Sequence, residues 1–144
     1  MFAQLDTKSV YSFMDSVVDL TTYIKRAKEL GYQALGLMDR DNLYAAYHFA
    51  QLASRNGLRP LIGMEANLFY EGRKIPFRLL AKNNQGYKNL MKLATELSSG
   101  QREFTAFSDY LNAIALILPS EDWEPGMTLG SEVFIGVRPE DAGK

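Results

Sequence analysis

The chain has 144 residues, of which 47% are hydrophobic and 23% are charged, and its formal net charge is -1. This length suits one domain with a sizeable core, and the charge balance lacks the basic footprint that most free-standing nucleic-acid binders carry. Cysteine is absent, which excludes disulfides, thiolate catalysis and cysteine-based zinc sites.

The hydropathy pattern gives no sign of membrane insertion or export. No segment approaches the ~18 consecutive apolar residues of a membrane span. The first residues, MFAQLD, lack the basic and apolar regions of a signal peptide. We therefore expect a cytoplasmic protein without membrane contacts.

The first half of the chain predicts two strands, each followed by a helix. A short apolar run, 2–5, precedes a helix that begins at an Asp19 cap and ends at Gly31. The apolar run 34–38 predicts a buried strand, and 39–42 ends it and caps a second helix that stops at 56–57. The inward residues expected on the two helices are Tyr23, Ile24, Ala27, Leu30, Leu43, Ala46, Phe49, Leu52 and Ala53.

The second half predicts a hairpin, a helix and two more strands. Leu61 and Ile62 begin a strand that continues through 66–70 into a turn at 71–73, and 75–81 returns. Asn84 is expected to cap a helix with Tyr87, Leu90, Met91, Ala94 and Leu97 facing the core. Strands at 113–118 and 133–137 follow, separated by a loop at 119–130. This order predicts an α/β fold with a mainly parallel sheet and one hairpin.

Polar clusters follow three of the predicted strands, at 6–9, 39–41 and 63–65. Because chemistry in parallel α/β sheets gathers beyond the carboxyl ends of the strands, any site is expected there. Charge is also uneven, since 72–92 carries only basic charges and the chain from residue 120 is mainly acidic. This uneven charge agrees with three alternatives, which are two solvated surfaces, a phosphate-binding track and docking against a larger partner.

Several segments together resemble one known family. They are FAQLDTKSVYS (2–12), RAKELG (26–31) with ALGLMD (34–39), NLY (42–44), RPLIGME (59–65) and LAKNNQGY (80–87). In this order they are similar to the amino-terminal polymerase-and-histidinol-phosphatase (PHP) domain of the bacterial DNA polymerase III alpha subunit, of the low-GC Gram-positive type. The resemblance implies a partial, distorted βα barrel of TIM-like design and makes 1–144 the front part of a longer chain.

The resemblance also implies a set of metal-site positions. Active family members hold divalent metals with a His-x-His pair, an Asp-His after the second strand and a Glu after the third. Such ligands suit zinc, manganese or iron. Here Asp6 and Lys8 stand in the His-x-His places, Arg40 replaces the His that follows Asp39, and Glu65 matches the Glu. Gln4 and Pro76 stand at or near two further histidine positions of the family.

These substitutions predict a degenerate site without catalytic residues or bound metal. Lys8 and Arg40 supply fixed positive charge beside the carboxylates of Asp6, Asp39 and Glu65, so we expect a salt-bridged pocket of these five residues. The single histidine, His48, is interpreted as a packing or surface residue of the second helix. Tyr11 and Ser12 are interpreted as connection residues, and Asn42 and Asn84 as helix caps.

The preferred functional hypothesis is a structural and interaction module of a replicative polymerase, inactive as a chain by itself. The resemblance implies a parent DNA-directed DNA polymerase, a nucleotidyltransferase that uses magnesium in another domain and meets DNA and nucleotides there. Other polymerase domains and replisome subunits are then the expected partners. The alternatives are a metal-dependent phosphoesterase or 3′-5′ proofreading nuclease, and an independent small binding protein. Because a barrel stopped at Lys144 leaves a strand edge open, we expect self-association or rearrangement of 113–137.

Overall fold

The computed structural model describes residues 3–4, 20–127, 129–130 and 132–136. The chain forms two compact units, Met1–Glu65 and Ala66–Lys144, and the border between them falls inside one long strand, β3 (Arg59–Tyr70). Every helix in the described ranges is too short or too polar to serve as a membrane span.

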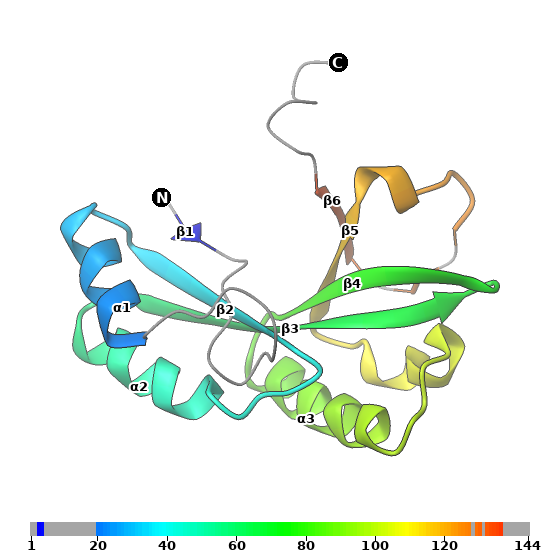
Figure 1. Ribbon diagram of the computed structural model, residues 1–144, viewed down its shortest axis with the longest axis horizontal. Helices are drawn as coiled ribbons and strands as arrows, with labels where there is room; N and C mark the ends of the chain where they lie inside the picture. The colour runs from blue at the N-terminus through cyan, green and yellow to red at the C-terminus, as the bar shows by residue number, and fades with distance from the viewer. Residues whose placement is uncertain (1–2, 5–19, 128, 131, 137–144) are drawn as a thin grey trace. The chain divides into compact units, whose positions relative to one another are not determined.

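The first unit combines parallel strands with two helices (Figure 1). Its strands are β1 (Ala3–Gln4), β2 (Ala34–Arg40) and the first part of β3, and its helices are α1 (Leu20–Glu29) and α2 (Ala46–Arg55). β2 pairs in parallel with both β1 and β3. The strand–helix alternation predicted from the sequence is therefore confirmed here.

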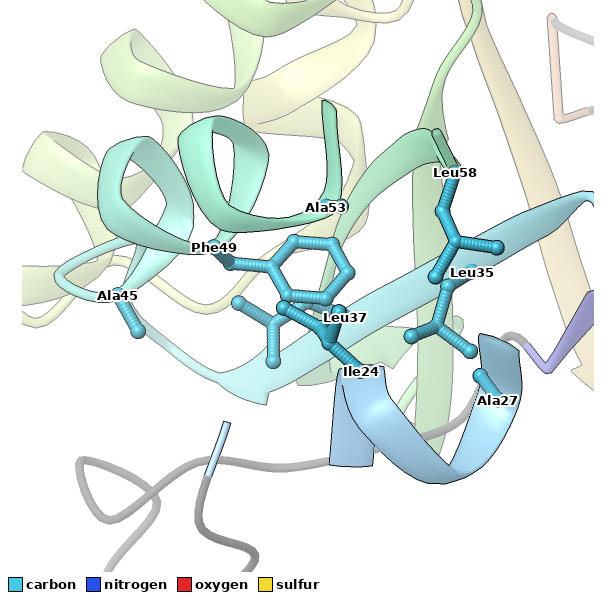
Figure 2. Close-up of a cluster of buried hydrophobic side chains, with 8 residues drawn as sticks. All are labelled: Ile24, Ala27, Leu35, Leu37, Ala45, Phe49, Ala53 and Leu58. Atoms are coloured by element: carbon cyan, nitrogen blue, oxygen red, sulfur yellow. The ribbon is translucent and has the colours of Figure 1, made fainter. Parts of the chain in front are cut away.

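Both helices of this unit pack on the face of β2 that carries Leu35 and Leu37 (Figure 2). Ile24 of α1 and the ring of Phe49 from α2 lie against these leucines, and all four side chains are almost fully buried. Tyr23 adds a polar anchor, because its hydroxyl donates a hydrogen bond to the Gly36 carbonyl oxygen at 2.9 Å. Burying each large apolar side chain contributes about 1.5–3 kcal/mol, so this cluster fixes the helices on the sheet.

Three details of the first unit differ from the sequence predictions. Leu30 is 55% exposed, because α1 ends at Glu29 and Gly31 turns the chain away with a φ of 81°. β2 continues through Arg40 instead of ending before Asp39. α2 begins only at Ala46, and its N-cap residue, Ala45, makes no side-chain hydrogen bond to the helix. Asn42, the predicted cap of this helix, accepts its hydrogen bond from the Tyr44 amide in the loop between β2 and α2.

The second unit is built around the hairpin of β3 and β4 (Arg73–Ala81), the two green strands that run to the right in Figure 1. Its turn is Glu71–Gly72, with φ values of 49° and 80°, as a two-residue type I′ turn requires. β4 pairs antiparallel with β5 (Ile114–Pro119), and β5 pairs in parallel with β6 (Glu132–Gly136). The sheet is thus parallel in three of its pairings and antiparallel around β4.

The helix α3 (Asn84–Ser98) covers one face of β4, on which Ile75, Phe77 and Leu79 are buried. The short 3-10 helix η1 (Phe104–Tyr110), which the sequence did not predict, adds Phe104, whose ring stacks on Phe77 at 4.9 Å between centroids. A second one, η2, spans Ser120–Asp122.

The predictions for α3 are wrong in two places. Asn83, and not Asn84, caps the helix, since its side-chain oxygen accepts a hydrogen bond from the Gly86 amide at 3.0 Å. Met91 is 43% exposed, because the buried stripe of α3 runs through Leu90, Leu93 and Leu97 and leaves Met91 to one side.

Candidate functional site

The carboxyl end of β2 and the middle of β3 bring together two of the three predicted polar clusters; the cluster at 63–65 lies inside β3, because that strand continues to Tyr70 instead of ending before the cluster. Their parallel register places Met38 beside Gly63, Asp39 beside Met64 and Arg40 beside Glu65. Both elements lie in the first unit up to Glu65. Asp6 and Lys8 lie outside the described residues, so only part of the expected five-residue pocket can be placed.

Arg40 and Glu65 form a close ion pair. The Arg40 Nη2 and Nε atoms both donate to Oε2 of Glu65, at 2.9 and 3.1 Å. The Glu65 side chain is only 8% exposed, whereas that of Arg40 is 43% exposed. The carboxylate is therefore buried against a guanidinium that reaches it from the solvent side, and the pair is electrically neutral.

The connection after β2 holds this ion pair in place. Asp41 adopts a φ of 60°, a left-handed conformation that aspartate tolerates better than most residues, and its amide donates to the Glu65 carbonyl oxygen at 2.9 Å. The buried Asn42 donates to the Arg40 carbonyl oxygen at 2.9 Å and accepts from the Tyr44 amide at 3.1 Å. The backbone on both sides of the pair is thus fixed by hydrogen bonds.

Asp39 lies on the other face of β2 from Arg40. Side chains alternate along a strand, so Asp39 shares the face of Leu35 and Leu37, which the helices cover. It is 1% exposed, and its neighbour across the strands is the buried Met64. The strand therefore separates Asp39 from the Arg40–Glu65 pair.

Three further predicted positions, His48, Gln4 and Pro76, belong to the described residues. The sequence predicts a packing or surface residue at His48, and its exposed position on α2 fits the surface alternative. Gln4 is the last residue of β1 and pairs with Leu35, while Pro76 belongs to β4 in the second unit. Within the described ranges, no three His, Cys, Asp or Glu side chains come close enough together to hold a metal ion.

Four of the six basic residues of segment 72–92 divide between two sides of the second unit. Lys74 and Arg78 lie on the face of β4 opposite to the one that α3 covers. Lys88 and Lys92 are exposed on α3 itself. Because the sheet and its apolar core separate the two pairs, they do not form one line of positive charge, which favours solvated surfaces over a phosphate track.

Comparison with known proteins shows to which family the chain belongs. A family model described as the PHP domain matches residues 4–124. The chain belongs to the PHP domain family. It is 47% identical over 137 residues to a DNA polymerase III subunit alpha from Streptococcus pyogenes, and 32% identical over 126 residues to that of Bacillus subtilis. These matches cover 95% and 83% of the chain but only 13% and 11% of the relatives.

Two solved structures share the fold of this PHP chain. One is from Bifidobacterium adolescentis, assigned as a metal-dependent phosphoesterase, with a TM-score of 0.59, 12% identity and coverage of 96% of this chain and 79% of that chain. The other is an amidohydrolase from Chromobacterium violaceum, with a TM-score of 0.50, 18% identity and coverage of 76% and 49%. At these identities the likeness concerns the fold alone, and it confirms the α/β, PHP-type fold class predicted from the sequence.

Proposed function

We propose that this PHP chain is a structural and interaction module of a replicative DNA polymerase III alpha subunit and works without a catalytic metal ion. The observation that carries the metal-free part is the contact of the Arg40 guanidinium with Glu65. The similarity to polymerase alpha subunits along 95% of the chain supports the replicative part.

The chemistry of this ion pair does not fit a metal centre. A guanidinium has no lone pair to offer a metal and stays protonated at any physiological pH. With Arg40 Nη2 2.9 Å from Oε2 of Glu65, a divalent cation on the same oxygen would meet a fixed positive charge. The ion pair gives the buried carboxylate its counter-charge, which is the role a metal plays in a catalytic site.

The chemistry of the parent protein then resides in its other domains. Nucleotidyl transfer with magnesium, and contact with DNA and nucleotides, belong to the polymerase domain of that cytoplasmic protein. This chain contributes a folded surface to neighbouring domains and replisome subunits.

Metal analysis tests the first half of the proposal. After gentle purification, and after incubation with manganese or zinc followed by desalting, elemental analysis should find far less than one transition metal per chain. A Glu65→Gln variant is the matched control, since it keeps the shape and removes the charge. One metal per chain that the control loses would contradict the proposal, as would hydrolysis of phosphomonoesters or DNA 3′ ends that Asp39→Ala or Glu65→Ala abolishes.

Immunodepletion tests the second half. An antibody raised against this chain should remove the replicative primer-extension activity from a cell extract, and add-back of the bound material should restore it. Non-immune antibody is the control. If the antibody removes only a 16.2 kDa polypeptide and leaves primer extension intact, the chain is not part of the polymerase.

A further inference from the structure

A groove between α1 and α2 in the first unit has an apolar floor and a cationic rim. It encloses about 510 Å³ and is lined by Thr21, Ile24, Lys25, Lys28, Glu29, Leu52 and Asn56. The two lysines and Thr21 follow one another at helical spacing along α1, so they stand on one side of the groove. Glu29 is paired with Arg26 at 3.6 Å, which leaves the lysines to set the charge of the rim.

A loop of the second unit, 120–126, has the complementary chemistry. It presents Trp123, which is 43% exposed, and this tryptophan follows Glu121 and Asp122. An exposed indole between acidic residues is an uncommon surface feature, because tryptophan is usually mostly buried. Such side chains are enriched among the residues that dominate binding at protein interfaces.

Arg73 holds this loop in one conformation. Its Nη2 donates to the Asp122 carbonyl oxygen at 3.0 Å, and its Nη1 lies 3.6 Å from Oε1 of Glu124. The tip of the β3–β4 hairpin is therefore tied to the backbone on one side of Trp123 and to a side chain on the other. A loop fixed in this way loses little conformational entropy when its tryptophan enters a pocket.

We propose that the 120–126 loop of one copy of the chain binds in the α1–α2 groove of a second copy. Trp123 would cover the apolar floor formed by Ile24 and Leu52, while Glu121 and Asp122 would face the two lysines of the rim. The expected occupant of the groove is a second copy of the chain, because each chain carries both the groove and the loop that complements it. This inference does not depend on the proposed function.

The contact joins a loop of one copy to a groove of another. Reciprocal exchange of the two loops gives a symmetric dimer, and any other rotation gives a larger ring or an open chain. A single tryptophan buries roughly 150–250 Å², far below a standard interface of about 1,600 Å², so the association is weak and reversible. Its electrostatic part is exposed to solvent and weakens as salt is added.

The single tryptophan of the chain gives a direct readout. As the chain concentration rises at low salt, Trp123 emission should shift to the blue while sedimentation shows growing mass. Trp123→Ala should weaken association at least about tenfold, as expected for a central interface residue. Emission and mass that stay constant across the concentration series would overturn the proposal.

Reversing the charges of the two surfaces distinguishes this contact from other modes of self-association. Chains with Lys25→Glu and Lys28→Glu, or with Glu121→Lys and Asp122→Lys, should each fail to associate alone. Mixing the two variants should restore association, because each altered surface then meets a partner of opposite charge. No recovery on mixing, with both variants shown to be folded by circular dichroism, would refute the pairing.

The matched control carries the same change of charge outside the groove. Lys88→Glu with Lys92→Glu alters two exposed lysines of α3 and should leave association within about twofold of the parent chain. An equal loss in this control would mean that net charge, and not the groove, governs association.

Discussion

Replacing Gly86 with alanine tests a close backbone approach in the second unit. Gly86 lies in the first turn of α3, is buried, and donates its amide to the Asn83 cap. A Cβ atom added there would lie 2.2 Å from the Ala113 carbonyl oxygen and 3.1 Å from the Ala81 Cα atom. Both neighbours are backbone atoms, so no side chain can rotate away to make room.

The expected cost follows from what would have to move. The Ala113 carbonyl oxygen also accepts the Lys82 amide at 2.9 Å, so displacing it strains or breaks that hydrogen bond. Overpacking costs about 1–3 kcal/mol, the hydrogen bond adds about 1, and the better helix propensity of alanine offsets up to about 1. We therefore expect Gly86→Ala to lower the free energy of unfolding by about 1–3 kcal/mol.

Urea denaturation followed by circular dichroism measures this difference, and Trp123 emission supplies a second probe of the same unit. The matched control is Lys88→Ala, an exposed substitution on the same helix that should stay within about 0.5 kcal/mol of the parent. In an unconstrained helix, Gly→Ala stabilises. A Gly86→Ala chain as stable as the parent, or more stable, would therefore refute the close approach.

Three further substitutions have defined expectations. Arg40→Ala should destabilise by about 1–2 kcal/mol, because it leaves the buried Glu65 carboxylate without its counter-charge. The exposure of the Arg40 side chain keeps this destabilisation small, since solvent screens the ion pair. A melting shift equal to that of Lys92→Ala would contradict the ion pair. Asn83→Ala should cost about 1 kcal/mol in urea denaturation through loss of the α3 cap, and no loss would disprove the cap. Ala113→Gly should stabilise by up to about 1 kcal/mol, because Ala113 has a φ of 62°, and destabilisation would argue against that conformation.

Much of the fold follows from residue patterns, and the errors have local causes. The uninterrupted apolar run predicted β2, and the turn expected at 71–73 predicted the β3–β4 hairpin, although Arg73 already belongs to β4. The cap of α3 was misplaced by one position because Asn83 and Asn84 are adjacent and both have the side chain of a good cap. η1 was missed because a 3-10 helix is short, although Phe104 and Phe107 recur at its three-residue period and are both buried.

The candidate site was only partly accessible to the same reasoning. Family positions pointed to Arg40 and Glu65, which the parallel register of β2 and β3 brings together. The sequence did not reveal that Asp39 and the Arg40–Glu65 pair lie on opposite faces of β2, because this arrangement depends on β2 continuing two residues past its apolar run. Once the strand includes Arg40, alternation decides which face each side chain takes. The complete five-residue pocket stays a prediction.

The length of β3 limits where this chain can accept insertions and deletions. Met64, Ala66 and Leu68 are buried at every second position along it, and Glu65 between them meets Arg40. Gain or loss of a single residue within the strand would exchange the faces of all positions beyond it and expose core residues. Variation in length among relatives should therefore concentrate in the Glu71–Gly72 turn and the connection before β6, and be rare between Arg59 and Tyr70.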